Sequence, residues 1–177
     1  MNVIPIFFLR AKAWQLFLLG TVLMLVYALI PLPDNGSLAG ELLTGVVIAL
    51  FCSFYLTWLW SVGEFLNSLL VRSLQFDKKY FRFALIYTFV HLLVSPFLFA
   101  FQNRTLDFLL LFSVVGLAIC FVYAMRSVAK AMVAVNTGIP AVYNEYIGIS
   151  FAIGFWIIGV WGLQPRINRL YADNPSF

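Results

Sequence analysis

Five long apolar stretches restrict the fold of this chain more than any other feature of its sequence. They cover residues 14–30, 42–62, 83–101, 106–125 and 146–164. A helix needs about 20 predominantly apolar residues to cross the hydrocarbon core of a bilayer, so each stretch is close to the length of a membrane span. The sequence therefore predicts an all-α fold, a transmembrane bundle of about five helices that forms one integral membrane domain over residues 1–177.

The composition excludes most soluble classes of protein. Hydrophobic residues make up 63% of the chain and charged residues 10%, against about 45–50% and 25% in soluble domains. A small soluble domain buries only about two-thirds of its unfolded surface, so it could not hide this much apolar area. We therefore expect the lipid bilayer to surround most of the chain, and we expect no nucleic-acid partner.

The basic residues predict the orientation. With the N-terminus in the cytoplasm, eight of them lie inside, namely Arg10, Lys12, Arg72, Lys78, Lys79, Arg82, Arg126 and Lys130. Cytoplasmic loops carry an excess of Lys and Arg, so this orientation is favoured and makes 63–82 and 126–145 cytoplasmic helical connections. Arg104, Arg166 and Arg169 then lie outside. The last two fit this arrangement poorly, which leaves two alternatives: the last segment crosses, as we expect, or it re-enters.

The segments between the spans carry their own signals. Apolar residues recur at helical spacing over 65–74, which predicts an amphipathic helix on the inner surface; a plain helical hairpin connection fits equally well. Residues 126–143 predict a helical extension of the fourth span that ends near Gly138 and Pro140. Pro165 is expected to end the last helix, because proline lacks an N–H donor and clashes with the preceding turn.

His91, the only histidine, is a candidate polar site within the third stretch. Tyr87 lies one turn before it and Ser95 one turn after it. An ionisable group at this depth suggests a proton relay or a ligand contact. The alternative is a neutral imidazole that bonds to these neighbours or to another helix.

A polar stripe follows the second stretch, and it consists of Ser53, Thr57, Ser61, Glu64 and Ser68. Steps of three and four residues place all of them on one helix face. The stripe could line a narrow pathway that ends at Glu64. Alternatively it serves helix packing, since Ser and Thr side chains form hydrogen bonds between helices in lipid.

Small residues form two further faces. One comprises Ser113, Gly116, Cys120 and Ala124, and the other Gly148, Ala152, Gly159 and Gly162. Small residues let helix backbones approach closely in a membrane. The two faces either pack against each other or leave a surface free for a second copy or another membrane protein.

Signatures of catalysis are missing from the sequence. It contains no H-E-x-x-H, G-x-S-x-G or P-loop pattern. One histidine with no suitably spaced cysteine or carboxylate does not make a zinc site, and Cys52 and Cys120 lie inside apolar stretches as small hydrophobes do. We therefore expect no enzymatic activity, no metal and no cofactor.

Three segments of the C-terminal third carry a resemblance to known proteins. They are Val128-Ala129-Lys130, residues 143–148 (Tyr-Asn-Glu-Tyr-Ile-Gly) and residues 161–168 (Trp-Gly-Leu-Gln-Pro-Arg-Ile-Asn). The chain resembles a group of uncharacterised small multi-pass membrane proteins of Bacteroidota-type bacteria that share a Gln-Pro-Arg-Ile-Asn tail. The resemblance covers about a quarter of the chain. It implies a location in the bacterial inner membrane and no particular activity.

Two classes of function remain. The first is a structural or partner-binding subunit of a membrane complex, with Arg166 and Arg169 as candidate interfacial docking residues or simple anchors. The alternative is a small transporter or pore built around His91 and the stripe on the second span. We favour the first, because the spans hold few ionisable residues and show no coupled pair of charges.

Overall fold

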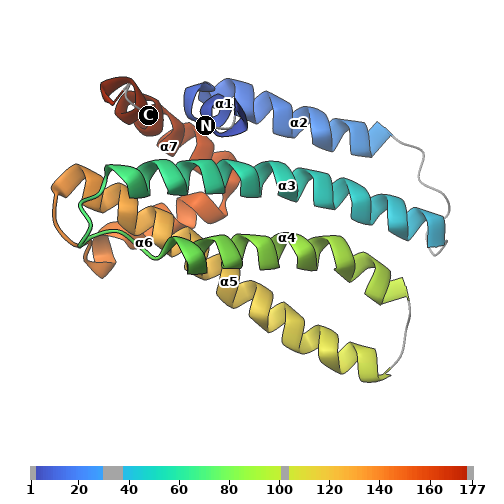
Figure 1. Ribbon diagram of the computed structural model, residues 1–177. Helices are drawn as coiled ribbons and strands as arrows, with labels where there is room; N and C mark the ends of the chain where they lie inside the picture. The colour runs from blue at the N-terminus through green and yellow to red at the C-terminus, as the bar shows by residue number, and fades with distance from the viewer. Residues whose placement is uncertain (1–2, 30–37, 101–103, 175–177) are drawn as a thin grey trace.

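The computed structural model describes residues 3–29, 38–100 and 104–174, and these residues form seven helices joined by turns (Figure 1). The helices are α1 (Val3–Arg10), α2 (Ala13–Leu29), α3 (Leu38–Leu69), α4 (Lys78–Ala100), α5 (Arg104–Thr137), α6 (Tyr143–Gly154) and α7 (Trp156–Asp173). The prediction of an all-α fold is confirmed.

Helix α3 lies at the centre of the bundle and contacts α1, α2, α4 and α5. In Figure 1, α2 to α5 run lengthwise, and α6 and α7 lie towards one end. The core is made of large side chains from several helices, with Trp58, Phe65, Phe81 and Ile167 fully buried. The position of the other helices along the bundle is therefore given by the residues of α3 that lie beside them.

The outer surface of the bundle is apolar. Leu111 and Ile119 on α5 expose 61% and 64% of their surface. Two helical segments, Gly45–Leu69 and Leu111–Thr137, are long and apolar enough to cross a membrane, and the bent pair α6–α7 could supply a third span. Because water does not favour such a surface, the structure is that of a membrane-embedded protein.

A short turn connects α3 to α4, so the amphipathic surface helix predicted over 65–74 is wrong and the helical hairpin alternative is right. Helix α3 runs straight to Leu69. The buried Asn67 then accepts the backbone N–H of Phe76 at 3.0 Å and donates to the Phe76 carbonyl at 3.3 Å. Asp77 caps α4 by accepting the N–H of Lys79 at 2.7 Å. The apolar residues over 65–74 recur at helical spacing because this part of the chain, including Phe65, packs inside the bundle.

Helix α5 continues well past its apolar part, as the sequence predicts. It spans 34 residues and ends at Thr137. Gly138 follows with φ of 72°, a left-handed conformation that glycine adopts without steric cost. The basic residues Arg126 and Lys130 therefore belong to the same rigid helix as the apolar residues before them.

The last apolar stretch is not one straight span. It divides into α6 and α7, whose axes turn by 114° at a break next to Gly154. The carbonyl of Ile153 accepts the Tyr55 hydroxyl at 2.9 Å, so the break lies beside the middle of α3. The ring of Tyr171 lies 5.7 Å from that of Phe65, close to the end of α3. Helix α7 therefore returns towards the end of α3 instead of continuing past its middle.

Helix α7 also passes through Pro165 and ends at Asp173, so the prediction that Pro165 ends it is wrong. Proline removes one N–H from the helix but fixes a helical φ. Its ring faces outwards, while the preceding Gln164 is fully buried. Hydrogen bonds made by Gln164 before the proline and by Asn168 after it hold α7 in a helical path.

Gln164 is the centre of these bonds. Its Nε2 donates to the carbonyls of Phe8 at 2.8 Å and Ala11 at 2.9 Å, and its Oε1 accepts the indole N–H of Trp58 at 2.9 Å. Asn168 donates a further bond to Ala11 at 3.2 Å. Carbonyls at the end of a helix have no partner within that helix. The tail motif thus satisfies the end of α1 and joins α1, α3 and α7.

The substitution Gln164→Leu should lower the free energy of unfolding by roughly 3 kcal/mol, because it leaves the Trp58 N–H and the Phe8 carbonyl unpaired in the interior. Thermal unfolding in detergent, followed by circular dichroism, measures the loss. Gln75→Leu is the matched control, since Gln75 is exposed and makes one bond, to Leu70. Equal unfolding temperatures for the two variants would contradict the role of Gln164.

Candidate functional site

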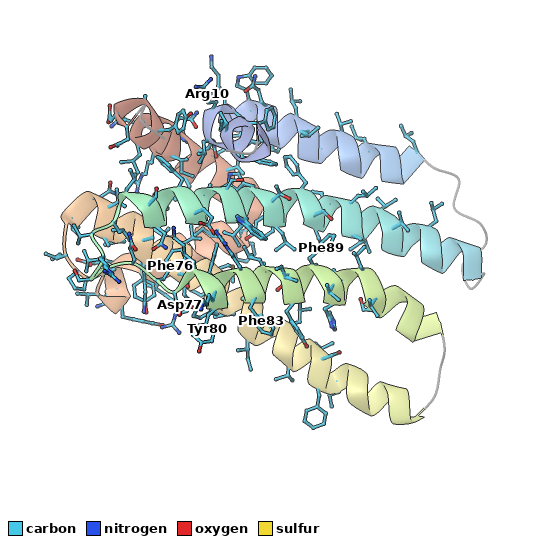
Figure 2. The ribbon with its side chains drawn as sticks, in the orientation of Figure 1. Arg10, Phe76, Asp77, Tyr80, Phe83 and Phe89 are labelled. Carbon is cyan, nitrogen blue, oxygen red and sulfur yellow. The ribbon has the colours of Figure 1, made fainter. Side chains whose placement is uncertain are left out.

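One end of the bundle gathers most of the charged side chains. Gly63 on α3 lies so close to Phe81 on α4 and Val128 on α5 that a Cβ there would meet both side chains. At the same level the guanidinium of Arg10 lies 5.5 Å from the centre of the Tyr171 ring. We call this end of the bundle the basic end. It is marked by Arg10 of α1, Gly63 of α3, Phe81 of α4, Val128 of α5 and Tyr171 of α7. Figure 2 shows Arg10 and Asp77 towards this end and Phe89 farther along α4.

Glu64 connects two helices at the basic end. It accepts a hydrogen bond from Arg82 Nε at 2.6 Å and lies 3.9 Å from the Lys78 ammonium. This hydrogen bond raises the pKa of Arg82, which precedes the apolar part of α4. Exposed ion pairs contribute about 1 kcal/mol at most. Glu64 thus joins α3 to α4 at the surface.

The hydroxyls of the polar stripe bond within their own helix. Thr57 donates to the Ser53 carbonyl at 2.7 Å, and Ser61 donates to the Thr57 carbonyl at 2.8 Å. Ser53 likewise donates to Ala49. Two of the stripe residues, Ser53 and Thr57, border a cavity of about 240 Å³ whose other walls are apolar side chains of α3 and α4. The stripe residues share one face of α3, as their spacing predicts. Their hydroxyls, however, already donate to backbone carbonyls of the same helix.

His91 lies on a different side of α4. Its ring stacks on that of Tyr87 at a centroid distance of 6.3 Å, and the Tyr87 hydroxyl donates to the Ser113 carbonyl on α5 at 3.2 Å. Helical spacing places Ser95 on this side too. The residues of α4 that border the stripe cavity are Leu85, Ile86 and Phe89. The structure therefore does not bring His91, Tyr87 and Ser95 together with the stripe.

The small-residue face of α5 is used inside the bundle. A Cβ on Gly116 would lie 2.7 Å from the Tyr87 hydroxyl, so this glycine makes room for a side chain of α4. Ala124 is fully buried, and Ser113 and Cys120 are half-buried. This face is occupied by neighbouring helices of the same chain.

The small residues of the last segment divide into two groups. Gly159 packs so tightly on α6 that a Cβ would overlap the Ala152 carbonyl. Gly148 and Gly162, in contrast, are exposed, and among the described residues no atom outside their own helical turn lies within 4 Å of a Cβ position. Phe155 and Trp161 beside them are 64% and 52% exposed. We use the name hairpin face for these exposed residues of α6 and α7, Gly148, Phe155, Trp161 and Gly162; the Trp161 ring also lies 5.8 Å from that of Phe17 on α2.

Arg166 and Arg169 are exposed on α7, as a docking role would require. The ion pairs found within the described ranges are both made by Glu64 and involve neither arginine. Sequence reasoning missed a second basic group: Arg126 Nη2 donates to the Tyr146 hydroxyl at 2.8 Å, and Lys130 lies 5.2 Å from the centre of the same ring. The spacing of four residues between these two cations was a signal for a shared face.

Within the residues that the structure describes, no three His, Cys, Asp or Glu side chains lie close enough to hold a metal ion. Cys52 and Cys120 are free thiols. Comparisons of the chain with protein-family models, curated proteins and solved structures find no match. The candidate site is therefore defined by geometry alone, as the basic end and the hairpin face.

Two glycines of α7 give a matched pair of tests. Gly159→Ala should destabilise the protein by about 2 kcal/mol or more, because the new methyl overlaps a backbone carbonyl of α6 that cannot easily move. Gly162→Ala meets open space and should stabilise α7 by up to about 1 kcal/mol. Thermal unfolding of both variants in the same detergent measures the difference. Similar unfolding temperatures would contradict the close packing of α6 on α7.

Proposed function

We propose that this protein is a structural or partner-binding subunit of a membrane complex, with α2, α3, α4 and α5 crossing the bilayer and the N-terminus in the cytoplasm. The α6–α7 hairpin enters from the cytoplasmic side and returns to it. The resemblance of the tail supports a bacterial inner membrane. The partner is a second copy or another membrane protein that covers the hairpin face.

The distribution of charge supports this topology over five crossings. If α6 and α7 return to the side from which they enter, Arg166 and Arg169 lie at the cytoplasmic end with the other basic residues. Ten of the eleven Lys and Arg residues then lie inside, and Arg104 alone lies outside. The positive-inside rule is better satisfied by this arrangement than by a fifth crossing.

The break between α6 and α7 is the observation that carries the proposed partner. It lies beside Tyr55, nine residues or about 14 Å along α3 from Glu64 at the basic end. That depth is near the middle of a core about 30 Å thick. Interrupted backbone at this depth is stable only when protein or a water-filled cavity covers it. Gly154 and Phe155 are exposed at the break, which favours coverage by a partner.

The transporter alternative receives less support from the same geometry. His91 and Tyr87 lie on a different side of α4 from the cavity that the stripe on α3 borders. The stripe hydroxyls bond to carbonyls of α3 itself. A pathway for ions or protons needs polar groups that face a common cavity. A subunit role needs only the exposed apolar surface that the hairpin provides.

The proposed topology can be tested with thiol labelling. In a background with Cys52→Ala and Cys120→Ala, single variants Asn144→Cys and Asp173→Cys mark the two outer ends of the hairpin. Both should react with a membrane-impermeant maleimide only in inverted vesicles, because both ends lie in the cytoplasm. Ser73→Cys in the exposed turn after α3 serves as the cytoplasmic reference. Labelling of Asn144→Cys and Asp173→Cys from opposite sides would show a fifth crossing.

The proposed partner surface can be tested by enlarging the exposed glycines. Gly148→Leu and Gly162→Leu should abolish the higher bands on a crosslinking gel of native membranes, because leucine prevents close approach of a partner helix. Val115→Phe, on the exposed surface of α5, is the matched control and should leave the bands unchanged. An unchanged ladder in both glycine variants would contradict a partner on the hairpin face.

A further inference from the structure

A groove between α5 and α6 runs from the basic end into the bilayer. It has a volume of about 450 Å³ and is lined mainly by apolar side chains, among them Met125, Ile147 and Phe151. Tyr143 and Arg126 lie at one end of it and Gly154 and Phe155 at the other. Its wall on α6 follows the whole 12-residue helix, which is about 18 Å long at 1.5 Å per residue, and its wall on α5 extends from Val122 to Arg126. The α6 wall is thus about as long as one leaflet of a hydrocarbon core about 30 Å thick.

A second hollow of about 580 Å³ follows the outer surface of α5 and meets the groove. Val122 and Arg126 line both. Ile119 and Ala118 form its apolar part, and Lys130 lies at its basic end. The groove and the hollow therefore meet at Arg126, and Lys130 borders the hollow one turn farther along α5.

These two cations have no carboxylate partner among the described residues, because both ion pairs found there belong to Glu64. Arg126 and Lys130 lie one helical turn apart, 5.6 Å and 5.2 Å from the centre of the Tyr146 ring. Like charges at this spacing repel each other. The nearest acidic residue in the sequence, Glu145, accepts the backbone N–H of Val142 at 3.0 Å and caps α6. An anion placed between the two cations would remove their repulsion.

We propose that this site binds one anionic glycerophospholipid of the cytoplasmic leaflet. The phosphate accepts hydrogen bonds from Arg126 and Lys130, one acyl chain occupies the α5–α6 groove, and the second follows the hollow on α5. The buried Tyr146 accepts the hydrogen bond from Arg126 and so holds the guanidinium at the mouth of the groove. Arginine and lysine are both suited to phosphate, arginine by its fork of N–H donors and lysine as a point charge.

This inference rests on the proposed topology only in placing the basic end at the cytoplasmic surface. It does not depend on a protein partner. The lipid experiment changes Arg126, Lys130 and Val122 on α5, and the assembly experiment changes glycines on α6 and α7. Phe155, which belongs both to the hairpin face and to the inner end of the groove, is changed in neither, so the two results can be told apart.

The test is native mass spectrometry of the full chain, purified in detergent and titrated with phosphatidylglycerol or phosphatidylcholine of identical acyl chains. The wild-type protein should bind one phosphatidylglycerol in preference to phosphatidylcholine. Arg126→Gln with Lys130→Gln should weaken phosphatidylglycerol binding roughly thirtyfold, since each basic residue near a membrane surface contributes about 1 kcal/mol and 1.4 kcal/mol corresponds to tenfold. Lys130→Gln alone, which keeps the Arg126–Tyr146 bond, should weaken it about fivefold.

Two controls separate this site from general surface charge and from a bare phosphate site. Arg72→Gln with Lys79→Gln removes the same charge from exposed positions near the α3–α4 turn and should leave binding unchanged. Val122→Trp keeps both cations but fills the junction of the groove and the hollow, and it should weaken both lipids. Equal binding of the two lipids by the wild-type protein, an equal loss in the Arg72/Lys79 variant, or full binding by Val122→Trp would each overturn the proposal. Displacement of the lipid by millimolar inorganic phosphate would also overturn it, because a phosphate alone would then account for binding.

Discussion

The buried amide of Gln164 determines where the C-terminal part of the chain lies. It donates hydrogen bonds to carbonyls at the end of α1 and accepts one from the indole N–H of Trp58 on α3. These bonds fix the position of α7 relative to both helices. Lipid supplies little hydrophobic force between helices, and interhelical polar bonds and close packing take over that role. The depth of α6, the position of the break and the return of the chain to the basic end all follow from this anchor.

The break itself is held from the other side by Tyr55, whose hydroxyl bonds to the Ile153 carbonyl. Under the proposed topology, a carbonyl at the end of α6 would otherwise be unpaired at a depth where no water is present. Gly159 completes the arrangement by allowing the backbone of α7 to touch α6. The contacts of Gln164, Tyr55 and Gly159 therefore accompany the division of an apolar stretch of spanning length into two helices that turn by 114°.

Some of this could be predicted from the sequence and some could not. The apolar stretches predicted helices and a membrane environment, and Gly138 predicted the end of α5, because both are local properties of the chain. The sequence left two alternatives for the last segment, crossing or re-entry, and did not locate the break at Phe155, because the apolar run continues through it. Only contacts with Tyr55 and Ala152 explain the turn. The spacing of Ser53 and Thr57 predicted a shared face, but whether their hydroxyls bond to a substrate or to their own helix depends on side-chain rotamers. In the sequence, Gln164 stands out only as part of the tail motif, because its acceptors are more than 150 residues away.

In the proposed topology, the α6–α7 hairpin also gives the protein unequal cross-sections in the two leaflets. Under the proposed topology, α2 to α5 occupy the outer leaflet, whereas α6 and α7 are added to them in the inner one. Each helix with its side chains is about 10 Å across, so the inner leaflet must accommodate roughly 150 Å² more protein. Such a wedge is accommodated with least lipid strain where the inner monolayer is the convex one. The shape of the hairpin thus couples the position of this protein to the curvature of the membrane that contains it.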